Sequence, residues 1–169
     1  MSNEITNRVA NSKLVTIDLE DFYPSGERLV FDIKKWLYQG LILKENDFRA
    51  AVKNHNWEAY QNTFVALTCS VEAIIPSWAY LLITVSLTPF AKKIIVGDLE
   101  QLESAIYQDI IHNMPVENYS DKPVIIKGCS DKFIPQTAYT QLVSKLHPIA
   151  KSIMYGEACS NVPLYKNKS

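Results

Sequence analysis

The chain has 169 residues, of which 47% are hydrophobic and 21% charged, and its formal net charge is −1. This composition is typical of a globular protein, and the balanced charge gives no electrostatic reason to expect binding to nucleic acid or to an anionic membrane. The longest apolar run falls far short of the ~20 residues that span a bilayer, and residues 1–13 lack the apolar core of a secretory signal, so we expect a single cytoplasmic domain over residues 1–169.

The first 60 residues are predicted to form an α/β segment that covers the rest of the chain. Alternating apolar and polar residues predict a short strand within 14–19, followed by an acidic turn. Asp32 is predicted to cap a short helix over 33–39, and Asn46 to cap a second helix over 47–54. Residues 28–60 otherwise carry the weakest pattern in the chain.

From residue 63 onward, strands and helices are predicted to alternate. Proline stands at the start of two of the predicted helices, where its missing N–H costs nothing, and Asp98 with Gln101 forms a capping pattern for another. The predicted elements are strand 64–68, helix 76–87, strand 93–96, helix 99–113, strand 124–127, helix 135–146 and strand 152–155.

Part of the chain occurs twice. Residues 75–97 align without a gap on residues 134–156, at an offset of 59, and ten of the 23 positions are identical. With one added residue, Gly128, the alignment also places Cys69 on Cys129. We interpret residues 61–97 and 120–156 as internal repeats.

Alternating strands and helices predict an α/β fold in three layers, with a mainly parallel sheet. We expect it to be built from two duplicated βαβ units, with the N-terminal segment packed on it. Two units related by a pseudo-twofold would place their first strands side by side. Numbering the repeat strands 64–68, 93–96, 124–127 and 152–155 from 1 to 4, the expected order is 2-1-3-4, with a ligand-binding crevice between strands 1 and 3.

The two repeat helices differ in their outer faces. Helix 76–87 carries apolar residues where helix 135–146 carries polar ones, so it is predicted to be covered on every side. Either the N-terminal segment or a second copy of the chain, in a homodimer, would cover this additional face.

The three cysteines are the candidate metal ligands. Cys69, Cys129 and Cys159 each follow a predicted strand, and the carboxyl ends of parallel strands share one edge of a sheet. Three converging thiolates would suit zinc or an iron–sulfur cluster, with Asp131, His147 or Glu157 as a possible fourth ligand. No CxxC motif supports this hypothesis.

Two alternatives remain open. The cysteines can be small apolar residues that pack inertly within a structural or protein-interaction module. One of them can instead serve a thiol-dependent enzyme, which requires a neighbouring cation or helix N-terminus to lower the thiol pKa. The chain has no nucleotide-binding or serine-hydrolase motif, so we lean towards a protein that is not an enzyme.

Several segments resemble the bacterial domain-of-unknown-function family 2480. They include NRVANSKLVTIDLEDFYP, VIIKGCS and AKSIMYGEACSNVPLYK, and the similarity covers nearly the whole chain. The resemblance implies a small cytosolic protein that serves as an accessory of iron–sulfur cluster assembly, with the assembly proteins as partners. It implies no catalytic residues, but it favours metal or cluster binding by the three cysteines.

Overall fold

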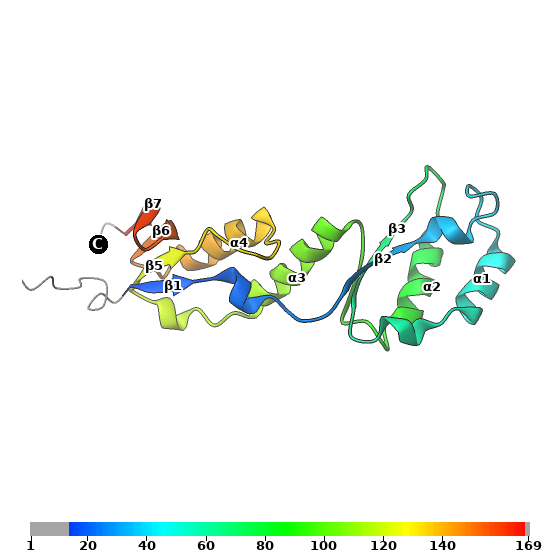
Figure 1. Ribbon diagram of the computed structural model, residues 1–169, viewed down its shortest axis with the longest axis horizontal. Coiled ribbons are helices and arrows are strands. Elements are labelled where there is room, and N and C mark those ends of the chain that lie inside the picture. The colour runs from blue at the N-terminus through cyan, green and yellow to red at the C-terminus, as the bar shows by residue number, and fades with distance from the viewer. Residues whose placement is uncertain (1–13, 168–169) are drawn as a thin grey trace, which may run out of the picture. The chain divides into compact units, whose positions relative to one another are not determined.

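The computed structural model describes residues 14–167, and these form a mixed α/β structure with four α-helices and two mostly parallel sheets (Figure 1). The described chain divides into two compact units. Unit 1 comprises residues up to Tyr23 together with Tyr107 onward, and unit 2 comprises Pro24–Ile106. The expectation of one domain over residues 1–169 stays a prediction.

Unit 2 contains a parallel sheet of three strands in the order β2-β3-β4. Its strands are β2 (Arg28–Asp32), β3 (Phe64–Thr68) and β4 (Lys93–Val96). Two short 3-10 helices, η2 (Ile33–Trp36) and η3 (Trp57–Tyr60), and helix α1 (Glu45–Asn54) connect β2 to β3, while α2 (Ser77–Leu87) connects β3 to β4.

Helices cover both faces of this sheet. On one face, α1 and α2 pack against the apolar side chains of Phe31, Val65 and Leu67, which are fully buried. Arg28 points to the opposite face because side chains alternate along a strand. There its guanidinium binds Glu103 of α3 (Leu99–Asn113) and lies over the ring of Phe64. The first half of α3 therefore covers the second face.

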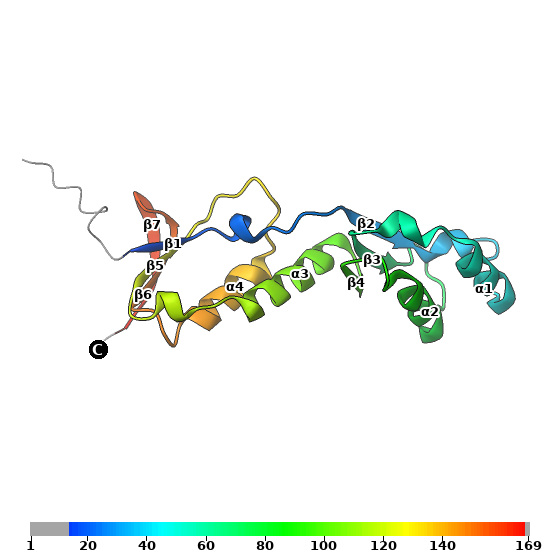
Figure 2. The same cartoon turned by 90° about the horizontal axis from the view of Figure 1, so that it is seen from below.

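Unit 1 contains a sheet of four strands in the order β1-β5-β6-β7. Its strands are β1 (Val15–Ile17), β5 (Pro123–Ile126), β6 (Ser152–Glu157) and β7 (Ser160–Lys166). The first three are parallel, β7 is antiparallel to β6, and α4 (Gln136–Leu146) connects β5 to β6. The end of α3 and α4 lie side by side along the sheet (Figure 2), and Ile111, Leu142 and Ile153 are buried in their common core.

The expected single sheet of order 2-1-3-4 is not found. β3 lies between β2 and β4, and β5 lies between β1 and β6, so neither central strand has a free edge with which to pair with the other. The strands that occupy those edges, β1 and β2, come from the N-terminal segment. That segment therefore completes both sheets instead of only covering one of them.

The two strand–helix–strand segments nevertheless pair in matching registers. Val65 pairs with Ile94 in unit 2, and Val124 pairs with Ile153 in unit 1, which preserves the offset of 59. The edge strands match as well, because Leu29 pairs with Val65 as Val15 pairs with Val124. That this correspondence reflects a duplication stays a prediction.

Most predicted elements are found within one or two residues of their expected limits. The capping pattern before α3 is confirmed, since the Gln101 amide donates to Asp98 Oδ1 at 2.8 Å and the Asp98 amide to Gln101 Oε1 at 2.9 Å. Asp32 caps η2, a 3-10 helix shorter than the predicted helix over 33–39. Strand β7, formed by the C-terminal tail, was not predicted.

The additional apolar face of α2 is covered only in part. Trp78 packs edge-on against Phe48 of α1, with 5.6 Å between ring centroids, so the N-terminal segment covers one side of the stripe. Leu81 and Val85, on the other side, remain 63% and 70% exposed.

Candidate functional site

The carboxyl edge of the unit 1 sheet carries an ion pair. Asp18 directly follows β1 and Lys127 directly follows β5, so two neighbouring parallel strands bring them together. Lys127 Nζ donates to Asp18 Oδ2 at 2.6 Å, and the Glu20 amide donates to Asp18 Oδ1 at 2.9 Å. Partial burial would raise the pKa of Asp18, but the hydrogen bonds from Lys127 and Glu20 and the Lys127 charge outweigh burial and lower it.

A second carboxylate ties down the loop that follows β5. Glu20 Oε2 accepts hydrogen bonds from the Ser130 hydroxyl and the Asp131 amide, both at 2.9 Å. The predicted acidic turn therefore serves to fix the loop between β5 and α4. Phe133 lies in the same loop and is more than half exposed.

Unit 2 has a corresponding tie at its own carboxyl edge. Asp32 is the last residue of β2 and corresponds to Asp18, which follows β1. Its carboxylate accepts hydrogen bonds from the Ser70 hydroxyl at 2.6 Å and the Ser70 amide at 3.1 Å. Burial opposes ionisation of Asp32, but these hydrogen bonds and that of the Lys34 amide lower its pKa. Ile74 occupies the loop position that matches Phe133 and is almost fully exposed.

A pocket of about 570 Å³ lies in unit 1 between α4 and the β6–β7 hairpin, and we call it the hairpin pocket. Mostly apolar and aromatic side chains line it, among them those of Ile126, Tyr139, Val143, Tyr155 and Leu164. The rings of Tyr139 and Tyr155 meet edge to face, with 5.7 Å between centroids. Its volume lies within the range of about 300–1,000 Å³ usual for ligand pockets.

Ile126, which lines the hairpin pocket, ends β5 and directly precedes Lys127 of the ion pair. Burial raises the pKa of the Tyr139 hydroxyl, and the charges of Tyr155, Asp18 and Cys129 raise it further. Gly128 lies under the ring of Tyr155, since a Cβ at that position would stand 2.9 Å from Tyr155 Cζ. Gly128, the residue added in the second repeat, thus leaves space for the Tyr155 ring, which forms one wall of the pocket.

The three cysteines are placed on two different sheets. Cys69 follows β3 in unit 2, is half-buried, and donates from Sγ to the Val71 carbonyl at 3.4 Å. Cys129 and Cys159 are exposed in unit 1, in the loop after β5 and in the β6–β7 turn. The expectation that Cys69 and Cys129 end adjacent strands is wrong, because β3 and β5 belong to different sheets.

No metal centre is found among the described residues: within 14–167, no group of three or more His, Cys, Asp or Glu side chains could hold a metal ion. The assignment of zinc or an iron–sulfur cluster to Cys69, Cys129 and Cys159 stays a prediction. The inert-packing alternative does not fit Cys129 and Cys159, because both side chains are exposed. For the thiol-enzyme alternative, the cation nearest in sequence to Cys129 is Lys127, whose ammonium binds Asp18.

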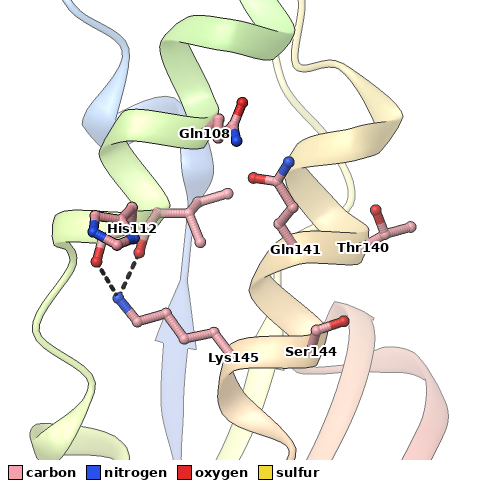
Figure 3. A pocket seen from close by; sticks show the side chains of 7 residues that line it. Gln108, His112, Thr140, Gln141, Ser144 and Lys145 are labelled. Atoms are coloured by element: carbon pink, nitrogen blue, oxygen red, sulfur yellow. Dashed lines mark hydrogen bonds between the residues drawn. The ribbon is translucent and has the colours of Figure 1, made fainter.

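A second groove of unit 1, of about 560 Å³, runs between α3 and α4 (Figure 3). Gln108 and Gln141 point toward one another across it, whereas Thr140 and Ser144 point away. Lys145 Nζ donates to the carbonyls of Ile111, His112 and Met114 at 2.6–2.8 Å, which satisfies its three donors and caps the end of α3. This lysine therefore has a structural role.

His55 of unit 2 lies among aromatic rings. Phe31, Trp36, Trp57 and Tyr60 surround its imidazole at centroid distances of 4.6–5.8 Å, and Nε2 lies 3.3 Å from the Tyr60 hydroxyl. Burial lowers the pKa of His55, and the nearby Lys35 charge lowers it further. The imidazole thus packs among the aromatic side chains of unit 2, where protonation is disfavoured.

Sequence reasoning did not single out the residues that form the hairpin pocket. Tyr139 is identical to Tyr80 in the repeat. Burial raises the pKa of both hydroxyls, and the charge of the cysteine in the same unit, Cys69 or Cys129, is a further cause in each case. The identity of Tyr80 and Tyr139 was the feature of the sequence that could have pointed to Tyr139. No such feature pointed to Tyr155 or Leu164, because they line the pocket only through the β6–β7 hairpin, which was not predicted.

These observations define the class of protein: an α/β protein with two mainly parallel sheets, one of which carries a pocket of ligand size between α4 and the β6–β7 hairpin. Within residues 14–167, no helix combines the length and apolar character needed to cross a membrane. The chain belongs to DUF2480, a family of proteins of unknown function, whose model matches residues 3–167. No curated protein and no solved structure matches it.

Proposed function

We propose that the protein is a non-enzymatic binding module that takes an apolar segment of a partner protein into the hairpin pocket. The observation that carries the proposal is the lining of this pocket. Tyr139, Val143, Tyr155 and Leu164 form apolar walls around about 570 Å³, a volume usual for ligand sites.

An extended ligand suits this site better than a small molecule. The apolar surface continues out of the pocket onto β7, where Val162 and Leu164 are 60% and 49% exposed, and Val162 stands opposite Tyr155. Small-molecule sites usually bury most of their ligand, whereas this pocket opens onto a further strip of apolar surface. A short segment with one side chain in the pocket would cover both.

The way in which such a segment binds follows from β7. Among the strands within residues 14–167, β7 pairs only with β6, so none of them occupies its outer edge. Pro163 stands in the middle of β7 and lacks an N–H, which disfavours the addition of a strand along that edge. We therefore assign recognition to side-chain contacts with the pocket and not to pairing with β7.

Selection from a displayed library of random peptides tests the proposal. We expect the full chain to enrich apolar and aromatic sequences, and Leu164→Glu to weaken their binding by about tenfold or more in calorimetry, because it places a charge in the pocket wall. Leu164 is half exposed, so the variant is expected to fold, which circular dichroism checks. Val85→Glu, at an exposed apolar position of unit 2, is the control. If no peptide is enriched, or if the enriched peptides bind Leu164→Glu as well as the wild type, the proposal fails.

A further inference from the structure

The outer face of α2 presents an apolar surface outside the proposed binding site. Leu81 and Val85 lie one turn apart on the same side of the helix and are 63% and 70% exposed. The matching positions of α4 are Thr140 and Ser144, which are polar. The two helices connect parallel strands in the same manner, so the polar pair in α4 indicates that the connection itself does not require apolar residues there.

The surroundings of this face indicate what binds it. Helix α2 carries no charged residue from Ser77 to Leu87, so a strongly charged partner finds no counter-charge on it. At its border, Arg49 of α1 lies 5.1 Å from the ring centroid of Trp78 and forms an ion pair with Glu45 at 2.8 Å. This ion pair places an acidic and a basic side chain together at the border, both more than half exposed.

Such a border is complementary to itself. In a twofold-symmetric contact, if residue i of one copy contacts residue j of the second copy, then residue j of the first copy contacts residue i of the second. Two uncharged α2 faces can then pack together, while Glu45 of one copy approaches Arg49 of the other and no like charges are forced into contact. A partner with a single sign of charge would gain from one of these side chains and be repelled by the other.

We infer that the α2 face formed by Leu81 and Val85, which Trp78 borders on the α1 side, is the contact surface of a homodimer. This contact adds a second, self-associating surface to the binding module and does not depend on the hairpin pocket. A helix pair of this length buries less than the roughly 1,200 Å² typical of tight complexes, so the dimer is expected to be weak and to dissociate on dilution.

Sedimentation velocity over a dilution series of the full chain tests the inference. The wild type is expected to shift from twice the monomer mass to the monomer mass as it is diluted. The double variant Leu81→Thr, Val85→Ser, which copies the residues of α4, is expected to weaken dimerisation by about tenfold or more. Leu164→Glu is the matched control and should dimerise as the wild type does. A wild type that is monomeric throughout, or a double variant that dimerises unchanged, overturns the inference.

The charged border gives a test of the symmetry. Arg49→Glu makes the border acidic on both copies and should weaken the dimer, whereas Glu45→Arg combined with Arg49→Glu exchanges the charges and should restore it. A double exchange that remains as weak as the single variant contradicts the twofold contact. Because Val85→Glu and Leu164→Glu each affect one surface, failure of dimerisation and failure of peptide binding are separately observable.

Discussion

Gly128 provides the sharpest test of the pocket geometry. A Cβ at this position would lie 2.9 Å from Tyr155 Cζ and 3.1 Å from Cε1, so Gly128→Ala must displace the ring. Tyr155 is 37% exposed and can move outward, which limits the cost. The displacement disrupts its edge-to-face contact with Tyr139, and such contacts contribute about 0.5–1.5 kcal/mol. Alanine also lowers the entropy of the unfolded chain, which stabilises by about 0.4–1 kcal/mol where the backbone is compatible.

The two effects can be separated in a double-mutant cycle with Tyr155→Ala. We expect Gly128→Ala to be neutral or slightly destabilising in the wild type and stabilising in the Tyr155→Ala background, with a coupling of about 1 kcal/mol. Hydrogen exchange at β5 and β6 is the suitable measurement, because the three tryptophans, Trp36, Trp57 and Trp78, lie in unit 2 and do not report on unit 1. Equal effects of Gly128→Ala in both backgrounds would refute the placement of Tyr155 over Gly128.

Three further predictions concern single side chains. Because the pKa of Asp18 is lowered in the folded state, its contribution to stability is present above about pH 4 and is lost on further acidification. Asp18→Asn should therefore reduce the loss of stability at acidic pH in a stability–pH profile. If the acidic part of the profile is unchanged, the ion pair with Lys127 is contradicted. The lowered pKa of His55 means that the unfolded chain takes up the proton first below about pH 6.5, so tryptophan-monitored stability should fall with pH below that value in the wild type and not in His55→Gln. Lys145→Met keeps the aliphatic stem but removes three charge-assisted hydrogen bonds, and should destabilise unit 1 by about 2 kcal/mol in urea unfolding followed by circular dichroism, whereas a loss below about 0.5 kcal/mol would exclude the capping role.

The local signals in the sequence were reliable where the physics is local. Capping by Asp98 and Gln101, and the placement of prolines at helix starts, depend on residues three or four apart, and the structure has α2, α3 and α4 within one residue of the predicted limits. The positions of strands β3 and β4 were predicted for the same reason. These elements depend on patterns among residues that are close together in the sequence, so they can be predicted from it directly.

Strand pairing was not predictable in the same way. β1 and β2 have only three and five residues, and they match one another at an offset of 14, as Asp18 matches Asp32, whereas the remaining elements match at 59. With different offsets the edge strands cannot appear in one alignment of the repeats. When β1 and β2 are not recognised, β3 and β5 each have a free edge. Pairing these two edges gives the expected order 2-1-3-4.

This difference in strand order changes what the repeated residues mean. With a single sheet, Cys69 and Cys129 would have faced each other across one crevice, and their correspondence would have indicated a shared site. With two sheets, the two residues of each matching pair lie at the carboxyl edges of different sheets. At each edge, one carboxylate binds the loop that follows the central strand: Asp32 binds Ser70 in unit 2, and Glu20 binds Ser130 in unit 1. Features common to both units then reflect how such a unit folds. Features present in one unit, namely the β6–β7 hairpin in unit 1 and the apolar outer face of α2 in unit 2, are where we place binding and self-association.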